Sequence, residues 1–161
     1  MAQRVISVKV TGEKTIKDNV SMLRRFFPDW LNEANLETAQ TILDEARNNV
    51  KQLDAFDTGE LYNSLQLNVS PKGLSVTVFS TSKHAPFIEF GTAPHWPPMA
   101  PIRAWCARKG LPESAAFLVA RAISERGTPE RPFLTPAYKV GIRQHIDRIR
   151  KFVGAGFRKL G

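Results

Sequence analysis

The sequence of 161 residues contains a single cysteine, Cys106, and no long apolar run. One thiol excludes an internal disulfide and any metal site built from several thiolates. No stretch approaches the roughly 20 apolar residues that a membrane-spanning helix needs, and residues 1–7 lack the apolar block of a signal peptide. We therefore expect a protein made in the cytoplasm and folded as one domain over residues 1–161.

Motifs of catalysis and metal binding are also missing. The three histidines, His84, His95 and His145, show none of the spacings typical of metal ligands. Neither a G-x-S-x-G elbow nor a G-x-x-x-x-G-K-[ST] phosphate loop occurs. Cys106 lies in the apolar run Ala104-Trp105-Cys106-Ala107, which favours a buried thiol over a nucleophile. The sequence predicts neither an enzyme nor a bound cofactor.

Positive charge is concentrated in the second half of the chain. Residues 1–100 carry 10 Lys and Arg against 11 Asp and Glu, whereas residues 101–161 carry 13 against 4. A basic half suits contact with phosphate or with an acidic protein face, and a solvated helix explains it equally well. Aromatic residues are scarce there, so a stacking platform for single strands is not predicted. The candidate contacts with DNA or an acidic partner are Arg143, Arg148, Arg150 and Lys151.

Apolar periodicity predicts several helices. A short one over residues 15–27 should end at Pro28, and a long one should run from Pro28 or Asn32 to Leu53. Further helices are expected over residues 101–109, 112–126 and 136–157. In the last of them the expected buried stripe is Ala137, Val140, Ile146, Ile149 and Val153.

Alternating patterns predict a small sheet between the helices. Leu65–Val69 and Leu74–Val78 alternate apolar and polar around the turn residues 70–73, which is typical of a β-hairpin with one buried face. Ile6–Val10 alternates as well and predicts a short strand. The fold class is therefore α+β: long N-terminal and C-terminal helices packed on a small antiparallel sheet with a central β-hairpin.

A proline-rich stretch follows the hairpin. Four prolines, at positions 94, 97, 98 and 101, lie within eight residues, a density that neither a helix interior nor a sheet tolerates. We expect an extended loop over residues 84–101, anchored by the Trp96 side chain. Its candidate contacts with another subunit or a partner are Pro94, His95, Trp96, Pro97 and Pro98.

Three short segments have a common order around the hairpin. They are D-T-G-E-L-Y-N-S-L at residues 57–65, A-P-F-I-E-F-G-T at residues 85–92 and R-P-F-L-T-P-A at residues 131–137. This order resembles the tail-component family of lambda-like phages, whose members are described as neck or tail-completion proteins. Pro86-Phe87 departs from the tyrosine–alanine pair common in that family. The positions that match are Asp57, Thr58, Gly59, Leu61, Ser64, Glu89, Phe90, Gly91, Thr92, Arg131, Pro132, Phe133 and Pro136.

The resemblance implies a structural protein of the virion at the neck or tail junction. Such subunits would form a homo-oligomeric ring that joins head and tail or completes the tail. The implied partners are connector, head-closure, tail-terminator and tail-tube proteins, together with packaged DNA contacted without sequence preference, and no membrane. The alternatives are a tail-terminator or head-closure ring of the same assembly and, from another class, a soluble basic nucleic-acid-binding protein.

Elementary chemistry gives the matching residues roles in the scaffold. Asp57 and Glu60 have the spacing of a capping box at a helix start. Phe90 and Phe133 are expected to anchor neighbouring segments to the core, and Arg131 to pair with Glu89. We therefore expect partner contacts on the loop after Thr92 and on the last helix.

Overall fold

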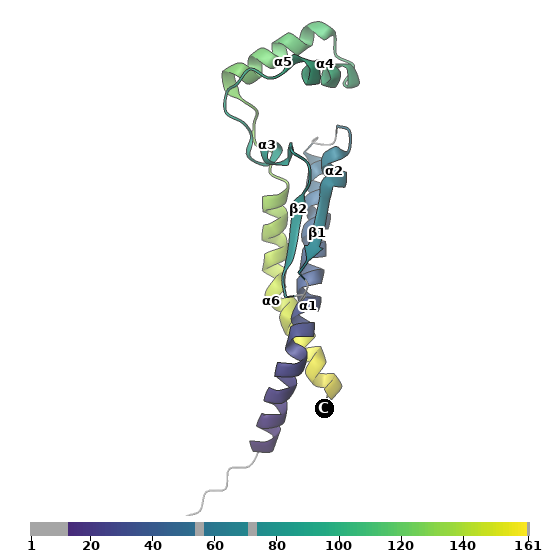
Figure 1. Ribbon diagram of the computed structural model, residues 1–161, viewed down its shortest axis with the longest axis vertical. Helices are drawn as coiled ribbons and strands as arrows, with labels where there is room; N and C mark the ends of the chain where they lie inside the picture. Colours follow the sequence, from purple (N-terminus) through teal and green to yellow (C-terminus); the bar gives the residue numbers. More distant parts are fainter. Residues whose placement is uncertain (1–12, 54–56, 71–73, 161) are drawn as a thin grey trace, which may run out of the picture.

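Two long helices form most of the protein. The computed structural model describes residues 13–53, 57–70 and 74–160, and it is mostly helical. Helices α1 (Glu13–Gln52) and α6 (Leu134–Leu160) lie side by side and antiparallel along the long axis (Figure 1). At 1.5 Å per residue, the 40 residues of α1 extend about 60 Å. The predicted fold class is confirmed, with the sheet limited to one hairpin.

Helix α1 runs through Pro28, so the predicted break at this proline is wrong. A proline inside a helix removes one hydrogen bond and disfavours the preceding turn. Aromatic side chains on either side of Pro28 pack on each other, with the Phe26 and Trp30 ring centroids 6.0 Å apart. Trp30 also meets Phe157 of α6 at 5.7 Å. Tertiary contacts therefore outweigh the local preference of the proline.

The predicted hairpin is confirmed, with the first strand at its predicted bounds and the second beginning and ending two residues later than predicted. Strands β1 (Leu65–Val69) and β2 (Val76–Ser80) pair antiparallel, with Leu67 opposite Val78. Leu67 and Val78 pack against the core formed with α1, which includes Ile42, Ala46 and Val50. The predicted strand over residues 6–10 lies outside the described residues.

Close packing of α6 on α1 depends on small residues of α6. A Cβ atom at Gly141 would lie 2.3 Å from the Ile42 side chain, and one at Gly156 would lie 2.1 Å from the Trp30 ring. Ala137, one turn before Gly141, is fully buried. The expected stripe through Ile146 is wrong at that residue, because Ile146 is 59% exposed. The rest of the stripe holds in part, since Ala137 is buried and Val140, Ile149 and Val153 are half-buried; Gly141, His145, Arg148 and Gly156 also contact α1.

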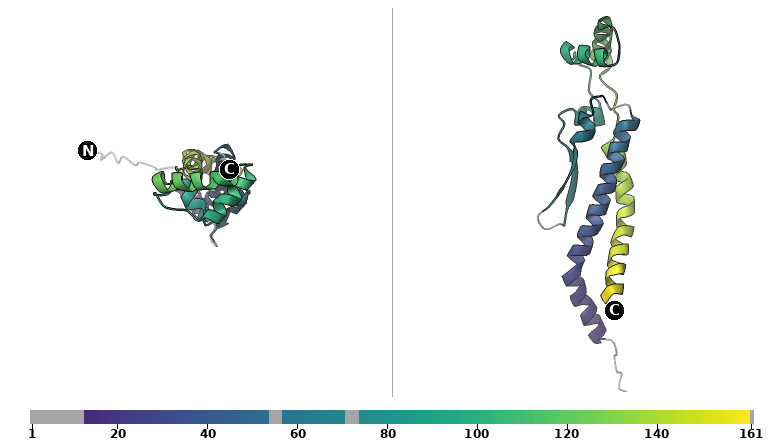
Figure 2. Two further views of the ribbon diagram at one scale, coloured as in Figure 1. Left: turned by 90° about the horizontal axis from the view of Figure 1, so that it is seen from above. Right: turned by 90° about the vertical axis from the view of Figure 1, so that its right-hand side faces the viewer.

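Two further helices form a lobe at one end of the molecule. Helices α4 (Met99–Arg108) and α5 (Glu113–Arg126) pack on each other beyond the end of the two long helices (Figures 1 and 2). Cys106 is buried here, as its apolar context indicated. Both helices follow the predicted boundaries within two residues. Among the described residues no helix is long and apolar enough to cross a membrane.

Two short helices complete the chain, and they correct the predicted loop. Helix α2 (Glu60–Ser64) leads into β1, and α3 (Ala85–Phe90) occupies part of the segment that we expected to be extended. Pro86 lies in the first turn of α3 and Pro101 in the first turn of α4. Backbone N–H groups of a first turn need no partner within the helix, so proline is tolerated there. Of the loop expected over residues 84–101, only residues 91–98 remain irregular apart from the bridge at Thr92.

Candidate functional site

The three matching segments meet where the lobe joins the long helices. Glu89, at the end of α3, is only 6% exposed and faces the start of α6. One carboxylate oxygen accepts the backbone N–H groups of Phe133 and Leu134 at 2.8 and 2.9 Å, and the other accepts that of Thr135 at 2.9 Å. The carboxylate therefore caps the N-terminus of α6 from 44 residues away.

This geometry replaces the predicted pair between Glu89 and Arg131. Among the described residues no ion pair joins the two side chains, and Arg131 contributes its backbone N–H to the Ile88 carbonyl at 2.8 Å. Burial raises the pKa of Glu89, but the hydrogen bonds from Thr135, Leu134 and Phe133 outweigh it, so the pKa is lowered overall. Glu89 is thus held as a charged acceptor.

The two chain segments that connect the lobe cross at Thr92 and Thr128. The Thr92 N–H donates to the Thr128 carbonyl at 3.1 Å, and the two hydroxyls lie 3.0 Å apart. Gly91 and Gly127, with φ of 69° and 72°, precede these threonines. A Cβ atom at Gly127 would lie 1.9 Å from the Thr92 carbonyl oxygen. Positions 91 and 127 therefore require glycine, because the backbone has a positive φ there and because a side chain would collide with the neighbouring segment.

Asp57 links the long-helix body to the lobe. Its carboxylate accepts hydrogen bonds from the Arg108 guanidinium in α4, with Nε 3.1 Å from Oδ2 and 3.3 Å from Oδ1. The hydrogen bond from Arg108 lowers the pKa of Asp57. The predicted capping box is wrong, since α2 has no side-chain cap and Glu60 accepts from Ser82 instead. Gly59, with φ of 78°, occupies the position before α2.

The remaining matching positions are divided between core and surface. Phe133 is 1% exposed and, as expected, anchors the core, and Leu61 and Ser64 are also buried. Phe90 is 73% exposed, so its expected role as an anchor is wrong. Its position at the last turn of the short helix α3 directs it away from the core that Ala85 and Glu89 enter.

The candidate contact residues of the proline-rich loop lie along the lobe. Pro97 is buried, whereas Pro94, His95, Trp96 and Pro98 are exposed. The Trp96 ring is 54% exposed and packs at 5.9 Å from Phe117 of α5. An apolar groove of about 890 Å³ opens beside this loop, between lobe and body. Its lining includes Phe87, Ile88, Pro94, His95, Trp105 and Ile123.

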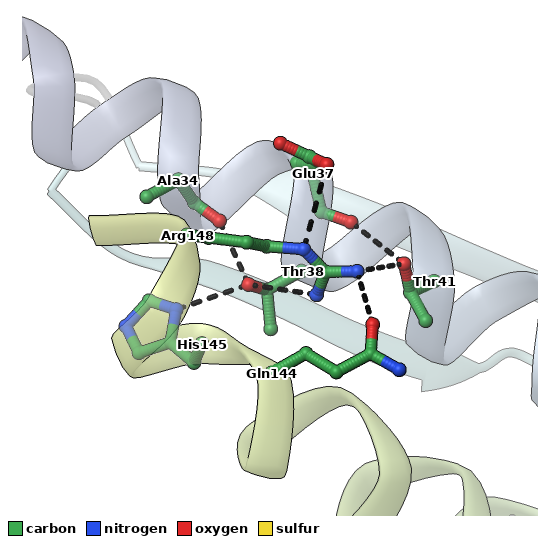
Figure 3. Close-up of polar contacts among 7 residues, drawn as sticks. All are labelled: Ala34, Glu37, Thr38, Thr41, Gln144, His145 and Arg148. Atoms are coloured by element: carbon green, nitrogen blue, oxygen red, sulfur yellow. Dashed lines mark hydrogen bonds and ion pairs between the residues drawn. The ribbon is translucent and has the colours of Figure 1, made fainter. Parts of the chain in front are cut away.

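Arg148 differs from the other basic residues of α6 that were expected to reach a partner. Its side chain is 11% exposed and lies against α1 (Figure 3). The guanidinium donates to Thr38 at 3.3 Å and to Thr41 at 2.8 Å, and it lies 3.6 Å from the Glu37 carboxylate. Arg148 is thus part of the contact between α1 and α6, and its expected role in partner binding does not fit this placement.

Arg143, Arg150 and Lys151 remain on the surface of α6. Arg150 is 75% exposed and pairs with Asp147 at 3.1 Å on the same helix. These three side chains can reach an anionic partner without disturbing the contact between the long helices. Among the described residues no group of three metal-binding side chains occurs.

Large apolar side chains on the surface were the main feature that sequence patterns missed. Tyr138, Ile142 and Ile146 form a row on α6 at intervals of four residues, with exposed fractions of 55%, 43% and 59%. Phe117 and Leu118 of α5 are 55% and 65% exposed. Periodicity marks such rows as apolar but does not distinguish a core-facing row from one that faces a partner.

Comparison with known proteins agrees with the order of the motifs. A family model described as "Bacteriophage HK97-gp10, putative tail-component" matches residues 14–91. No curated protein and no solved structure gives a significant match. The matched range contains the segment at residues 57–65 and most of that at 85–92, and it ends before the R-P-F segment. The predicted resemblance is thereby confirmed: over residues 14–91 the chain matches the HK97-gp10-like family of phage tail components.

Proposed function

We propose that the protein forms a homo-oligomeric ring at the neck or tail top of a tailed phage, where it joins head and tail or completes the tail. The match to a family of phage tail components carries this proposal. Proteins of that kind act through surfaces that bind neighbours rather than through a reaction. Connector, head-closure, tail-terminator and tail-tube proteins are the partners we propose.

The distribution of exposed apolar side chains supports an assembled state. One set lies on α6, at Tyr138, Ile142 and Ile146, and another lies on the lobe, at Phe117 and Leu118. Large exposed apolar groups that lie close together are typical of surfaces that bind another protein. Because the two sets lie on different elements of an elongated molecule, α6 and α5, each can meet a different neighbour, as the heterologous contacts of a ring require (Figure 1).

Electron microscopy of the purified protein, together with quantitative mass spectrometry of virions, tests the proposal. We expect ring-shaped particles and a fixed number of copies per virion, located at the junction of head and tail. The same images separate this role from that of a tail-terminator or head-closure ring, which would lie at another level of the junction. Absence of the protein from virions would refute the proposal.

The basic surface of α6 supports a contact with packaged DNA or an acidic partner. Arg143, Arg150 and Lys151 are its members, and Arg148 is left out because it holds the fold. Replacing the three with Gln should weaken the completion of particles while leaving the ring intact. Complementation by the triple variant, scored as infectious particles, measures this effect. Normal titres would show that these charges have no role in assembly.

The second candidate function, a soluble nucleic-acid-binding protein, rests on the same basic surface. Phosphate contacts make the observed affinity fall steeply with salt concentration. If the isolated protein bound duplex DNA with such a dependence and did not enter virions, this candidate would replace the structural role. Entry into virions without DNA binding by the isolated protein would exclude it.

A further inference from the structure

The sheet has one edge that the described residues leave open. Outside the strands, Ser70 N–H donates to the Ser75 carbonyl at 2.9 Å and Thr81 N–H to the Ser64 carbonyl at 3.1 Å. Since hydrogen-bonded pairs alternate along an antiparallel ladder, the backbone groups of Val76, Val78 and Ser80 point away from β1. None of these outward groups has a hydrogen-bond partner among the described residues.

An apolar groove runs along this open edge. It has a volume of about 810 Å³ and lies between β2, α1 and α6. Ala39 and Ile42 of α1 and Tyr138 and Ile142 of α6 contribute to its lining. Tyr138 and Ile142 are 55% and 43% exposed, so a strand added to this edge would cover apolar surface that now faces solvent. An open ladder beside an unfilled apolar groove is suited to strand addition.

The chain contains a segment with the pattern that this edge requires. Residues 6–10, Ile-Ser-Val-Lys-Val, are as many as the residues of β2 and alternate apolar and polar. On the edge of β2, Ile6, Val8 and Val10 would continue the apolar face of the hairpin and cover the groove. Ser7 and Lys9 would point to solvent on the other face, where Thr77 of β2 lies exposed.

The length of α1 prevents this segment from reaching the groove of its own chain. Asn35, which donates to the Leu74 carbonyl at 3.0 Å, is the groove residue of α1 nearest the helix start at Glu13. At 1.5 Å per residue, Glu13 lies about 33 Å from Asn35. The seven-residue step from Ile6 to Glu13 spans at most about 25 Å even when fully extended. If residues 6–10 occupied this edge, they would therefore have to come from another molecule.

We propose that residues 6–10 of one copy add as a third strand to the open edge of β2 in the next copy. The contact is head-to-tail, because the donated strand and the receiving edge are different surfaces. Repetition of such a contact gives a ring when the rotation between copies closes. This inference rests on the proposed ring and names the contact that would hold it together.

A disulfide between Val8→Cys and Val78→Cys tests the contact in a Cys106→Ala background. Both residues are the central ones of their segments, so they come together whether the added strand runs parallel or antiparallel. Oxidation should give a ladder of covalent dimers, trimers and larger species, and each single-cysteine variant should stay uncrosslinked. A protein crosslinked only within the monomer, or one that forms no disulfide while it remains oligomeric, would overturn the proposal.

A matched pair of charge substitutions gives a second measurement. Val8→Lys places a charge toward the groove, whereas Ser7→Lys places the same charge toward solvent. Light scattering should show that Val8→Lys loses the oligomer and that Ser7→Lys retains it, with equal helix content by circular dichroism. An oligomer that persists in Val8→Lys would overturn the donated strand and leave the ring standing. A wild-type protein that stays monomeric in solution and in particles would overturn both.

Discussion

At the scale of single residues, the side chains that identify the family have structural tasks that follow from their contacts. Glu89 was singled out by its motif, yet its partner could not be read from the sequence. Because the motifs place an arginine and a carboxylate together, an ion pair between Glu89 and Arg131 was expected. In the structure the Glu89 carboxylate instead accepts three backbone N–H groups at the start of α6. Helix ends leave N–H groups unpaired, and a buried acid from a distant segment can satisfy them. Sequence patterns do not report such long-range caps.

Replacing Glu89 with Gln should lower the free energy of unfolding by about 2 kcal/mol at pH 7, because a charged acceptor of three N–H groups is lost. The pKa of Glu89 is lowered in the folded state. Its contribution is therefore complete above the unfolded pKa, about 4.3, and is lost as the pH falls through the folded pKa. Urea denaturation from pH 7 to pH 3 should show the difference between wild type and variant shrinking with acidity.

The control for this experiment is Glu130→Gln, which makes the same chemical change at an exposed residue. It should leave the urea midpoint within about 0.5 kcal/mol of wild type. A Glu89→Gln variant as stable as Glu130→Gln at pH 7 would show that the cap of α6 contributes nothing to folding.

Arg148 and Arg150 have the same charge and lie two positions apart on α6, yet they should respond differently to substitution. The Arg148 side chain is 11% exposed, donates hydrogen bonds to Thr38 and Thr41 of α1, and forms an ion pair with Glu37 of α1. Replacing it with Gln should destabilise the fold by about 1–3 kcal/mol, whereas Arg150→Gln should change stability by less than about 0.5 kcal/mol. Thermal denaturation of both variants measures this. Equal melting temperatures would contradict the structural role of Arg148.

At the scale of helices and strands, local patterns predicted more than they did for individual contacts. The hairpin, α4 and α5 follow from alternation, helical spacing and the stop residues Gly110 and Gly127. Their signals are local, so tertiary structure had little to add. Pro28 is the opposite case: the local signal ends a helix, but Phe26, Trp30 and Phe157 pack across it. The face of α6 was also misjudged in part, because Gly141 and Gly156 pack directly on Ile42 and Trp30 of α1 while Ile146 is exposed.

Two glycines of α6, two residues apart, should give opposite results when replaced by Ala. Gly154 has open space where a Cβ atom would lie, so Gly154→Ala should stabilise the protein by about 0.5–1 kcal/mol through better helix propensity. A Cβ atom at Gly156 would meet the Trp30 ring at 2.1 Å, so Gly156→Ala should destabilise by about 1–3 kcal/mol. Chemical denaturation distinguishes them. A stabilising Gly156→Ala would mean that α1 and α6 pack less closely than the structure shows.

At the scale of the whole molecule, the family motifs outline the junction between two parts of the protein. Residues 91–98 and 127–133 connect the lobe to the long helices and cross at Thr92 and Thr128. The Asp57–Arg108 pair adds a contact between the two parts. The sequence could indicate each segment but not their meeting, because it depends on where α4 lies relative to α2. The crossing and the Asp57–Arg108 pair are therefore contacts that hold the lobe against the long-helix body.

Removal of the Arg108 side chain should increase the motion of the lobe relative to the long helices without unfolding the protein. The pair is partly exposed, at 44% and 30% of the two side chains, so Arg108→Ala should cost at most about 1 kcal/mol of stability. Spin labels at Asn48→Cys on α1 and Ser114→Cys on α5 report the distance between body and lobe. Cys106 is 1% exposed and should not take up label. The distance distribution should broaden in Arg108→Ala, whereas the melting temperature should stay nearly unchanged.

The matched control is Arg103→Ala, because Arg103 also lies on α4 but pairs with Glu113 inside the lobe, at 3.5 Å. Its distance distribution should equal that of wild type. If both variants broadened equally, loss of charge on α4 would be the cause and the Asp57–Arg108 contact would have no special role. If neither broadened, the crossing at Thr92 and Thr128 would be sufficient to fix the lobe. Broadening in Arg108→Ala alone would identify the Asp57–Arg108 pair as the contact that sets the angle of the lobe.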